Sequence, residues 1–276
     1  MSDPARPGVY VRRFDAYDRV LHGLLMLSFL GLAFTGLPLL FSDQAWARAI
    51  AHVLGSFEVA GWLHRVSALL LIVVFALHLV RIGRRIVLQH DYGVLWGPRS
   101  MVPRWKDATD LVGHVGWFLG RGARPRFDRY TYWEKFDYWA VFWGMGIIGA
   151  SGLLLWFPQT FARIVPGWAF NVATLVHGEE ALLAVGFIFT MHFFNGHLRP
   201  EKFPMDPVIF TGRVPETELE AERPEEYARL AGTGGLDALR TTPPDAWVVR
   251  LGRTVGTIAV LAGLLMLGLI LYAVAR

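Results

Sequence analysis

The chain alternates between long apolar segments and polar connections. Five segments contain about 20 mostly apolar residues each, which is the length that a helix needs to cross the hydrocarbon core of a bilayer. They cover approximately residues 20–41, 62–82, 138–157, 172–195 and 255–274. This pattern predicts an all-α integral membrane protein, with a four-helix bundle followed by a fifth, C-terminal transmembrane helix.

The basic residues between these segments are distributed very unequally. Residues 1–19, 81–137 and 196–253 contain 4, 11 and 8 lysines and arginines, 23 in all, whereas the remaining connections and the C-terminus contain four. Those four are Arg48, Arg65, Arg163 and Arg276. Because cytoplasmic loops are enriched in basic residues, we expect a cytoplasmic N-terminus and a periplasmic C-terminus.

The polar connections suggest three consecutive regions. Residues 1–200 would form the four-helix core, with an amphipathic helix on the inner surface near residues 107–120. Its apolar side chains Leu111, Val112, Val115, Phe118 and Leu119 recur with a helical period. Residues 201–253 mix proline, glycine and acidic residues and would form a cytoplasmic cap or docking segment, and residues 254–276 would form the last transmembrane helix.

Composition agrees with a membrane protein and limits its chemistry. Hydrophobic residues make up 54% of the 276 residues and charged residues only 18%. The absence of cysteine excludes disulfides, thiolate-bound iron–sulfur clusters and covalently attached haem c, so histidine is the remaining soft ligand. The net charge of +4 follows the membrane topology and does not indicate nucleic-acid binding.

Five of the nine histidines lie near the ends of the apolar segments. His22 opens the first segment, His64 and His78 lie 14 residues apart at the two ends of the second, and His177 and His192 lie 15 residues apart in the fourth. In an α-helix, the last two would be about 22 Å apart along the axis and about 60° apart around it. Ionisable residues within a span are costly and are functional candidates.

Histidines at two depths favour b-type haem, whose iron takes an axial ligand from each side. The outer pair would be His64 with His177, and the inner pair would be His192 with either His22 or His78. Structural zinc needs four ligands at one level, which this arrangement does not supply. Glycines in the first and third segments would let a macrocycle or another helix approach closely: Gly31, Gly36, Gly144, Gly146, Gly149 and Gly152.

Several segments also resemble a known family. RVLHGLLMLSFLGLAFTGLPLLF, WLHRVSALLLIVVFALHLV, FDYWAVFWGMGIIGASGLLLWFP and MHFFNGHLRPEKFPMD resemble the membrane cytochrome b subunits of bacterial respiratory complexes. This group includes the formate dehydrogenase gamma subunit and nickel–iron hydrogenase cytochrome b, and the chain is most similar to cytochrome b modules associated with periplasmic multihaem cytochromes c. The resemblance covers approximately residues 12–230.

The resemblance implies a multi-pass protein of the bacterial inner membrane with two b haems. It would be an electron-transfer subunit of an oxidoreductase complex, exchanging electrons between a periplasmic multihaem cytochrome c or iron–sulfur partner and membrane menaquinone or ubiquinone. The ligands of the formate dehydrogenase and hydrogenase relatives correspond to His22, His64, His177 and His192. His78 departs from that pattern and resembles the cytochrome b of bc complexes, so it remains an alternative ligand, a quinone-site residue or part of a third haem site.

His197 follows His192 by five residues, which in an α-helix would turn it about 140° away. With Asn195 and Arg199 it is a candidate for hydrogen bonding to a quinone. Two other functions are compatible with parts of the pattern. A histidine-lined transporter or a proton or metal channel would be expected to show broken helices and internal repeats, and a haem-free membrane anchor would not need paired histidines at two depths.

Overall fold

The computed structural model describes residues 8–275, and within them five helices are long and apolar enough to cross a membrane. They span Ala16–Leu40, Phe57–Val87, Tyr132–Trp156, Trp168–Leu198 and Ala246–Val274. These helices confirm the predicted all-α membrane fold with its fifth C-terminal helix. Arg276, one of the four basic residues counted on the outer side, lies outside the described residues.

The helices extend beyond the apolar segments from which they were predicted. The second begins at Phe57 and ends at Val87, five residues beyond the expected segment at each end, and the fifth begins at Ala246 instead of residue 255. Hydropathy detects only the apolar middle of a helix. The additional turns carry charged residues such as Arg84, Arg85 and Arg250, which suit the headgroup region of a bilayer.

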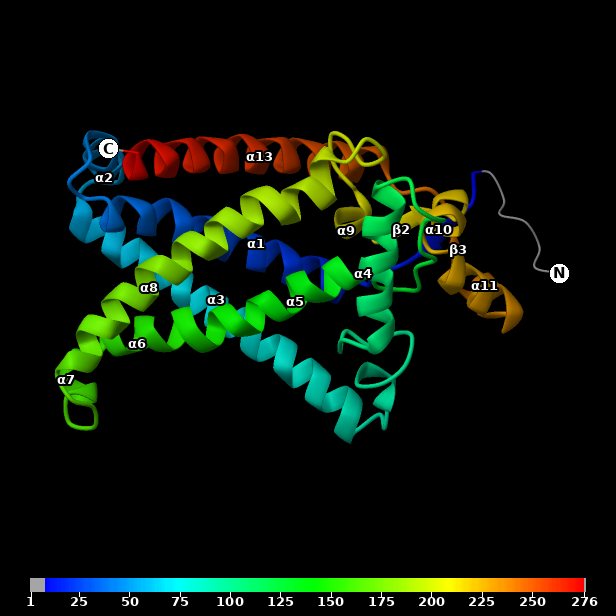
Figure 1. Cartoon of the computed structure of the whole chain (residues 1–276), viewed down its shortest axis with the longest axis horizontal. Helices are drawn as coiled ribbons and strands as arrows, with labels where there is room; N and C mark the ends of the chain where they lie inside the picture. Colours follow the sequence, from blue (N-terminus) through cyan, green and yellow to red (C-terminus); the bar gives the residue numbers. More distant parts are fainter. Residues whose placement is uncertain (1–7, 276) are drawn as a thin grey trace. The chain divides into compact units, whose positions relative to one another are not determined.

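Shorter elements connect the five helices (Figure 1). The α-helices are α1 (Ala16–Leu40), α2 (Ala45–Leu54), α3 (Phe57–Val87), α4 (Trp105–Phe118), α5 (Tyr132–Gly144), α6 (Ala150–Trp156), α7 (Pro158–Phe161), α8 (Trp168–Phe187), α9 (Val208–Thr211), α10 (Glu216–Glu222), α11 (Pro224–Gly232), α12 (Gly235–Leu239) and α13 (Ala246–Val274). The strands are β1 (Tyr10–Arg12), β2 (Arg213–Pro215) and β3 (Arg240–Thr241), and η1 (Tyr92–Val94) is a 3₁₀ turn.

The chain forms two compact units, each built from several segments. One unit, here called the sheet unit, contains residues 8–20, 78–139 and 207–252. The other, here called the bundle unit, contains residues 21–77, 140–206 and 253–275. The three consecutive regions expected from the sequence remain a prediction about the chain's organisation.

The sheet unit is organised around three short antiparallel strands in the order β2-β1-β3. Val11 pairs with Val214 on one side and with Arg240 on the other, so the N-terminal segment is the central strand. Val11 is also buried in a small apolar core, whose other buried members are Val208, Val214, Leu219, Tyr227 and Leu236. Pairing between strands about 200 residues apart leaves no local pattern, which is why the sequence predicted no sheet.

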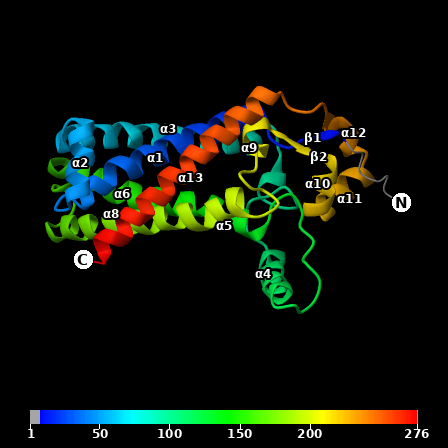
Figure 2. The same ribbon diagram turned by 90° about the horizontal axis from the view of Figure 1, so that it is seen from above.

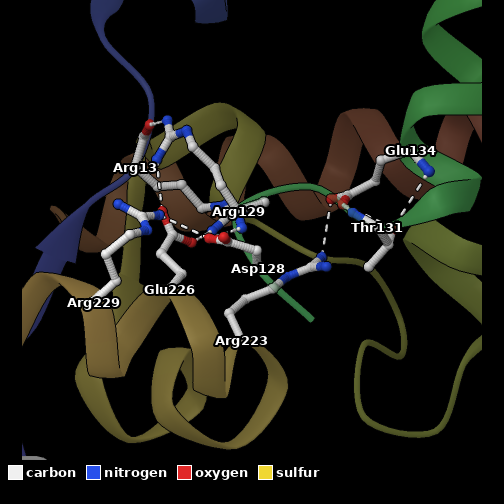
Figure 3. Close-up of polar contacts among 8 residues, drawn as sticks. All are labelled: Arg13, Asp128, Arg129, Thr131, Glu134, Arg223, Glu226 and Arg229. Atoms are coloured by element: carbon white, nitrogen blue, oxygen red, sulfur yellow. Dashed lines mark hydrogen bonds and ion pairs between the residues drawn. The ribbon is translucent and has the colours of Figure 1, made fainter. Parts of the chain in front are cut away.

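An ion-pair cluster joins Arg13, which follows β1, to the start of α5 and to α11 (Figure 3). Glu226 is its centre, because its two carboxylate oxygens accept hydrogen bonds from Arg13 (2.7 Å) and Arg129 (3.0 Å). Two further pairs complete the cluster: Arg229 with Asp128 (2.7 Å) and Arg223 with Glu134 (3.0 Å). Burial alone would raise the pKa of Glu226, but the two arginines outweigh it and lower that pKa below its ordinary value.

The bundle unit has an apolar core to which three helices contribute. Its buried members are Ala33 and Leu37 of α1, Val185, Phe189 and Phe193 of the fourth span, and Ala259 and Met266 of α13. Figure 2 shows α13, drawn in orange to red, crossing α1 and α8. A Cβ atom at Gly263 would lie 2.7 Å from the Phe189 ring, so the glycine is what permits α13 to pack this closely.

Two of the spans contain π-helical segments, which the sequence did not predict. The third span includes η2 (Met145–Gly149), and the fourth continues from α8 into η3 (Ile188–His192) and η4 (Phe194–Leu198). A π-helical turn joins residues i and i+5 and takes more residues per turn than an α-helix. The angles derived above from α-helical geometry, including 140° between His192 and His197, therefore do not apply across this part of the chain.

Candidate functional site

Four of the five predicted histidines form two facing pairs in the bundle unit. His64 of α3 faces His177 of α8, with their ring centroids 6.2 Å apart and their planes at 77°. His22 of α1 faces His192 of η3, with centroids 6.5 Å apart and planes at 32°. Each pair thus combines one imidazole from the fourth span with one from a neighbouring span.

These separations can be compared with what a shared metal ion would require. With an imidazole–metal bond of about 2.0 Å on each side, two rings on opposite sides of one ion have centroids roughly 6.3 Å apart. A direct hydrogen bond between facing imidazole nitrogens would bring the centroids to about 5 Å. The distances within both pairs agree with axial ligation of a haem iron and are too long for a direct, in-line bond.

In the pair formed by His64 and His177, the Nδ1 atom of each ring has a partner that defines its protonation. His177 Nδ1 lies 3.0 Å from the carbonyl oxygen of Ile148, so Nδ1 carries the proton and donates it. His64 Nδ1 lies 3.1 Å from the hydroxyl of Thr35, which itself donates to the carbonyl of Gly31 and is free to accept from the ring. Both imidazoles are thereby left with an Nε2 lone pair, as metal-bound histidines usually are.

Two glycines make room for this pair. A Cβ at Gly36 of α1 would lie 3.0 Å from His64 Cε1, and one at Gly152 of α6 would lie 2.9 Å from His177 Cε1. A side chain at either position would push the imidazole away. Gly31 instead faces the side chain of Ser67, whereas a Cβ at Gly146 would meet nothing within 4 Å. Glycine therefore permits a close approach at Gly31, Gly36 and Gly152, to a different side chain at each, but not at Gly146.

His78 lies in the sheet unit and has a different partner. Its Nε2 lies 2.9 Å from the hydroxyl of Tyr138, and the two rings are 5.5 Å apart. Ligation of a metal through Nε2 would require this hydrogen bond to break. The structure therefore pairs His192 with His22 and His78 with Tyr138.

The three quinone candidates differ in how their polar atoms are engaged. The Asn195 amide donates to the carbonyl of Met191 in its own helix at 2.9 Å, and Arg199 lies 3.6 Å from the carboxylate of Glu201. His197 is 91% buried, since its exposed fraction is 9%, and within residues 8–275 its Nδ1 has no hydrogen-bond partner. A buried unpaired nitrogen is costly, so His197 is the candidate best placed to bind a further polar group.

The fifth span contributes to the surroundings of His197. A Cβ at Gly256 of α13 would lie 2.5 Å from Met205 Sδ and 3.1 Å from His197 Cε1. Gly256 thus accommodates both side chains where α13 crosses the end of the fourth span. This role could not be predicted from the sequence, and neither could those of Thr35, Ile148 and Tyr138, because none of these residues has a fixed spacing from its histidine.

Residues 13–201 match the family described as prokaryotic cytochrome b561. This match covers more than half of the chain, so the chain belongs to that family. It is accordingly a membrane b-type cytochrome of the electron-transport class and a multi-pass protein of the bacterial inner membrane. The match includes both histidine pairs and ends before α13. No curated protein matches the sequence.

Proposed function

We propose that this chain is the cytochrome b subunit of a respiratory complex, which transfers electrons across the membrane between a periplasmic redox partner and quinone through two b haems. The observation that carries the proposal is the presence of two facing imidazole pairs in one bundle, at 6.2 and 6.5 Å. A haem-free anchor would not need either pair. A metal or proton channel would not need both pairs to match the spacing for axial haem ligation.

Each pair would hold one haem: His64 with His177, and His22 with His192. Haem supplies reversible one-electron transfer when it is bound. Thr35 and Ile148 would keep Nδ1 of the first pair protonated, orient both rings and increase the basicity of Nε2. The hydrogen bond between His78 and Tyr138 favours His22 over His78 as the partner of His192, and two haems over three.

His197 would bind the quinone. Its unpaired Nδ1 can hydrogen-bond to the carbonyl oxygen of a quinone or the hydroxyl of its reduced form and exchange a proton with it. Ubiquinone and menaquinone both present such a carbonyl. Asn195 and Arg199, which already have partners within the chain, would assist by shaping the end of the fourth span.

The second redox partner would be a separate subunit. The chain contains no cysteine to hold haem c or an iron–sulfur cluster, so a water-soluble donor or acceptor must be supplied by another protein, such as a multihaem cytochrome c or an iron–sulfur protein. The distribution of basic residues supports an N-terminus in the cytoplasm and a C-terminus in the periplasm, and hence a periplasmic partner at the side with few charges.

A haem count tests the proposal directly. The purified full-length protein should show a dithionite-reduced b-type α-band, and a pyridine haemochrome assay should give two haems per chain. The absence of the band would refute haem binding altogether. One or three haems per chain would refute the two-pair assignment.

Single substitutions then test the ligands. His22→Ala should remove one of two haems, whereas His78→Ala should retain both, because His78 Nε2 is engaged with the Tyr138 hydroxyl. The opposite result would assign His78 to the inner haem. His197→Ala should retain both haems but slow their reoxidation by a soluble quinone analogue, and an unchanged rate would exclude His197 from the quinone site.

A further inference from the structure

Helix α4 in the sheet unit has its charged side chains turned inward. Asp107 accepts a hydrogen bond from Lys135 at 2.8 Å, and Lys135 is only 2% exposed. Lys106 pairs with Asp110 at 2.8 Å. His114 is buried as well, with its Nδ1 3.0 Å from the Tyr132 hydroxyl. The polar face of α4 therefore packs against the rest of its own unit.

The outward face of α4 is apolar. Six large side chains on this face and at the helix end are between 45 and 82% exposed: Trp105, Leu111, Val112, Val115, Phe118 and Leu119. At about 100° per residue, they fall within an arc of roughly 140°. A helix in contact with water normally shows the reverse arrangement. An apolar face of this extent is the mark of an interaction surface.

Positive charge follows immediately after this face. Arg121 and Arg126 are exposed, and the guanidinium of Arg124 lies 5.6 Å from the centre of the Trp117 ring. The neighbouring acids are each paired with a cation: Asp107 with Lys135, Asp110 with Lys106, and Asp128 with Arg229. The arginines after α4 are therefore available to an external anion.

We propose that α4 is an interfacial helix that binds anionic phospholipid. Its apolar face contacts acyl chains, and Arg121, Arg124 and Arg126 contact phosphate headgroups. Five helices within residues 8–275 are long and apolar enough to cross a membrane, so lipid is a ligand that this protein always meets. Exposed apolar side chains next to unneutralised arginines match the two layers of an anionic membrane surface, hydrocarbon and phosphate.

Lipid contact can be measured with a single label, because the chain contains no cysteine. Val112→Cys in the full-length protein, labelled with a polarity-sensitive fluorophore, is reconstituted in nanodiscs of phosphatidylcholine and phosphatidylglycerol. Glu220→Cys, at an exposed position of α10 in the same unit, is the matched control. Nitroxide-bearing lipid should quench the label at position 112 at least about two-fold more than the label at position 220. Equal quenching would overturn the proposal.

The charge requirement is tested separately. In the labelled Val112→Cys protein, nitroxide on phosphatidylglycerol should quench more than nitroxide on phosphatidylcholine. A further Arg121→Gln/Arg126→Gln substitution should reduce this preference by about five-fold per arginine. Arg48→Gln/Arg163→Gln removes the same charge from the bundle unit and should leave the preference unchanged.

Other occupants of this face give distinct results. A partner protein or a second copy of the chain would shield position 112 from nitroxide lipid and, for a second copy, make quenching depend on the number of chains per disc. Retention of both haems in the double arginine variant, judged from its absorption spectrum, shows that the variant is folded. Loss of lipid preference in such a protein is then due to the arginines, and failure of the lipid proposal leaves the haem assignment unaffected.

Discussion

The two units bury polar side chains in different ways. In the bundle unit, the imidazoles His64 and His177 are held by a hydroxyl and a backbone carbonyl from neighbouring helices. In the sheet unit, the buried Glu226 is held by two arginines, and Glu216, which is 0% exposed, is paired with Arg240 at 2.7 Å. These imidazoles therefore have uncharged partners, whereas these buried carboxylates have charged ones.

This difference fits the role proposed for the imidazoles. A permanent charge beside a redox centre would shift its potential strongly in a medium of low dielectric, so neutral partners suit a ligand that must remain available to a metal. The sheet unit has no such requirement among the described residues, and its ion pairs join segments that are far apart in the chain. Changes in the sheet unit should therefore affect stability, and changes around the imidazoles should affect haem.

The largest effect is expected from Glu226→Gln. This change leaves Arg13 and Arg129 without their shared carboxylate, and breaking a buried pair in this way typically costs about 3–5 kcal/mol. Chemical denaturation followed by tryptophan fluorescence should show this loss, while the haem spectrum is retained before unfolding. Glu220→Gln removes the same charge from an exposed position and should have almost no effect. Equal stability of the two variants would contradict a central role for Glu226.

The same carboxylate predicts a dependence on pH. The pKa of Glu226 in the folded protein is below its ordinary value of 4.5, so ionised Glu226 stabilises the fold at pH values above 4.5. This contribution is lost as the pH falls through the lowered pKa. The stability difference between wild type and Glu226→Gln should be constant near neutral pH and shrink below about pH 4.5. A difference that grows on acidification would have the wrong sign.

A smaller and more local effect is expected from Gly152→Ala. The new Cβ would lie 2.9 Å from His177 Cε1, and crowding of this kind costs about 1–3 kcal/mol. One of the two haem components should lose occupancy or shift in a redox titration of the α-band. Gly146→Ala, in the same span, places its Cβ in open space and serves as the control. If both haem components shifted, or neither did, Gly152 would not act through the pair formed by His64 and His177.

The smallest effect is expected from Thr35→Val, which removes one hydrogen bond from His64. The loss of a bond worth about 0.5–1.5 kcal/mol corresponds to roughly 20–60 mV for a one-electron couple. Because a less basic imidazole stabilises ferric iron less, the midpoint potential of that haem should rise. Thr35→Ser keeps the hydroxyl and should restore the original potential. A purely packing role for Thr35 would give the opposite ranking of the two variants.

Hydropathy and histidine spacing predicted much of this molecule. The five spans, the membrane b-type cytochrome and its inner-membrane location are confirmed. The spacings also pointed to the histidines that the structure brings together as His64 with His177 and His22 with His192. Spacing is informative here because a transmembrane helix has a fixed length and few polar residues. The position of a histidine within its span therefore gives its approximate depth in the bilayer.

The remainder depends on contacts that leave no periodic signal. Nothing local in the sequence joins Thr35 to His64 or Tyr138 to His78 across some 30 and 60 residues. The π-helical segments also escaped prediction, because hydropathy does not record how many residues make a turn. For the same reason, the relation between His192 and His197 could not be obtained from their spacing.

The position of Gly256 has a consequence for the biosynthesis of the protein. The ribosome must add residues 199–245 after the fourth span before α13 can be made and can cover His197. Until α13 is made, the helix that packs against His197 and Met205 is absent. His197 and Met205 therefore acquire Gly256 as a neighbour only in the last step of synthesis, when α13 is inserted.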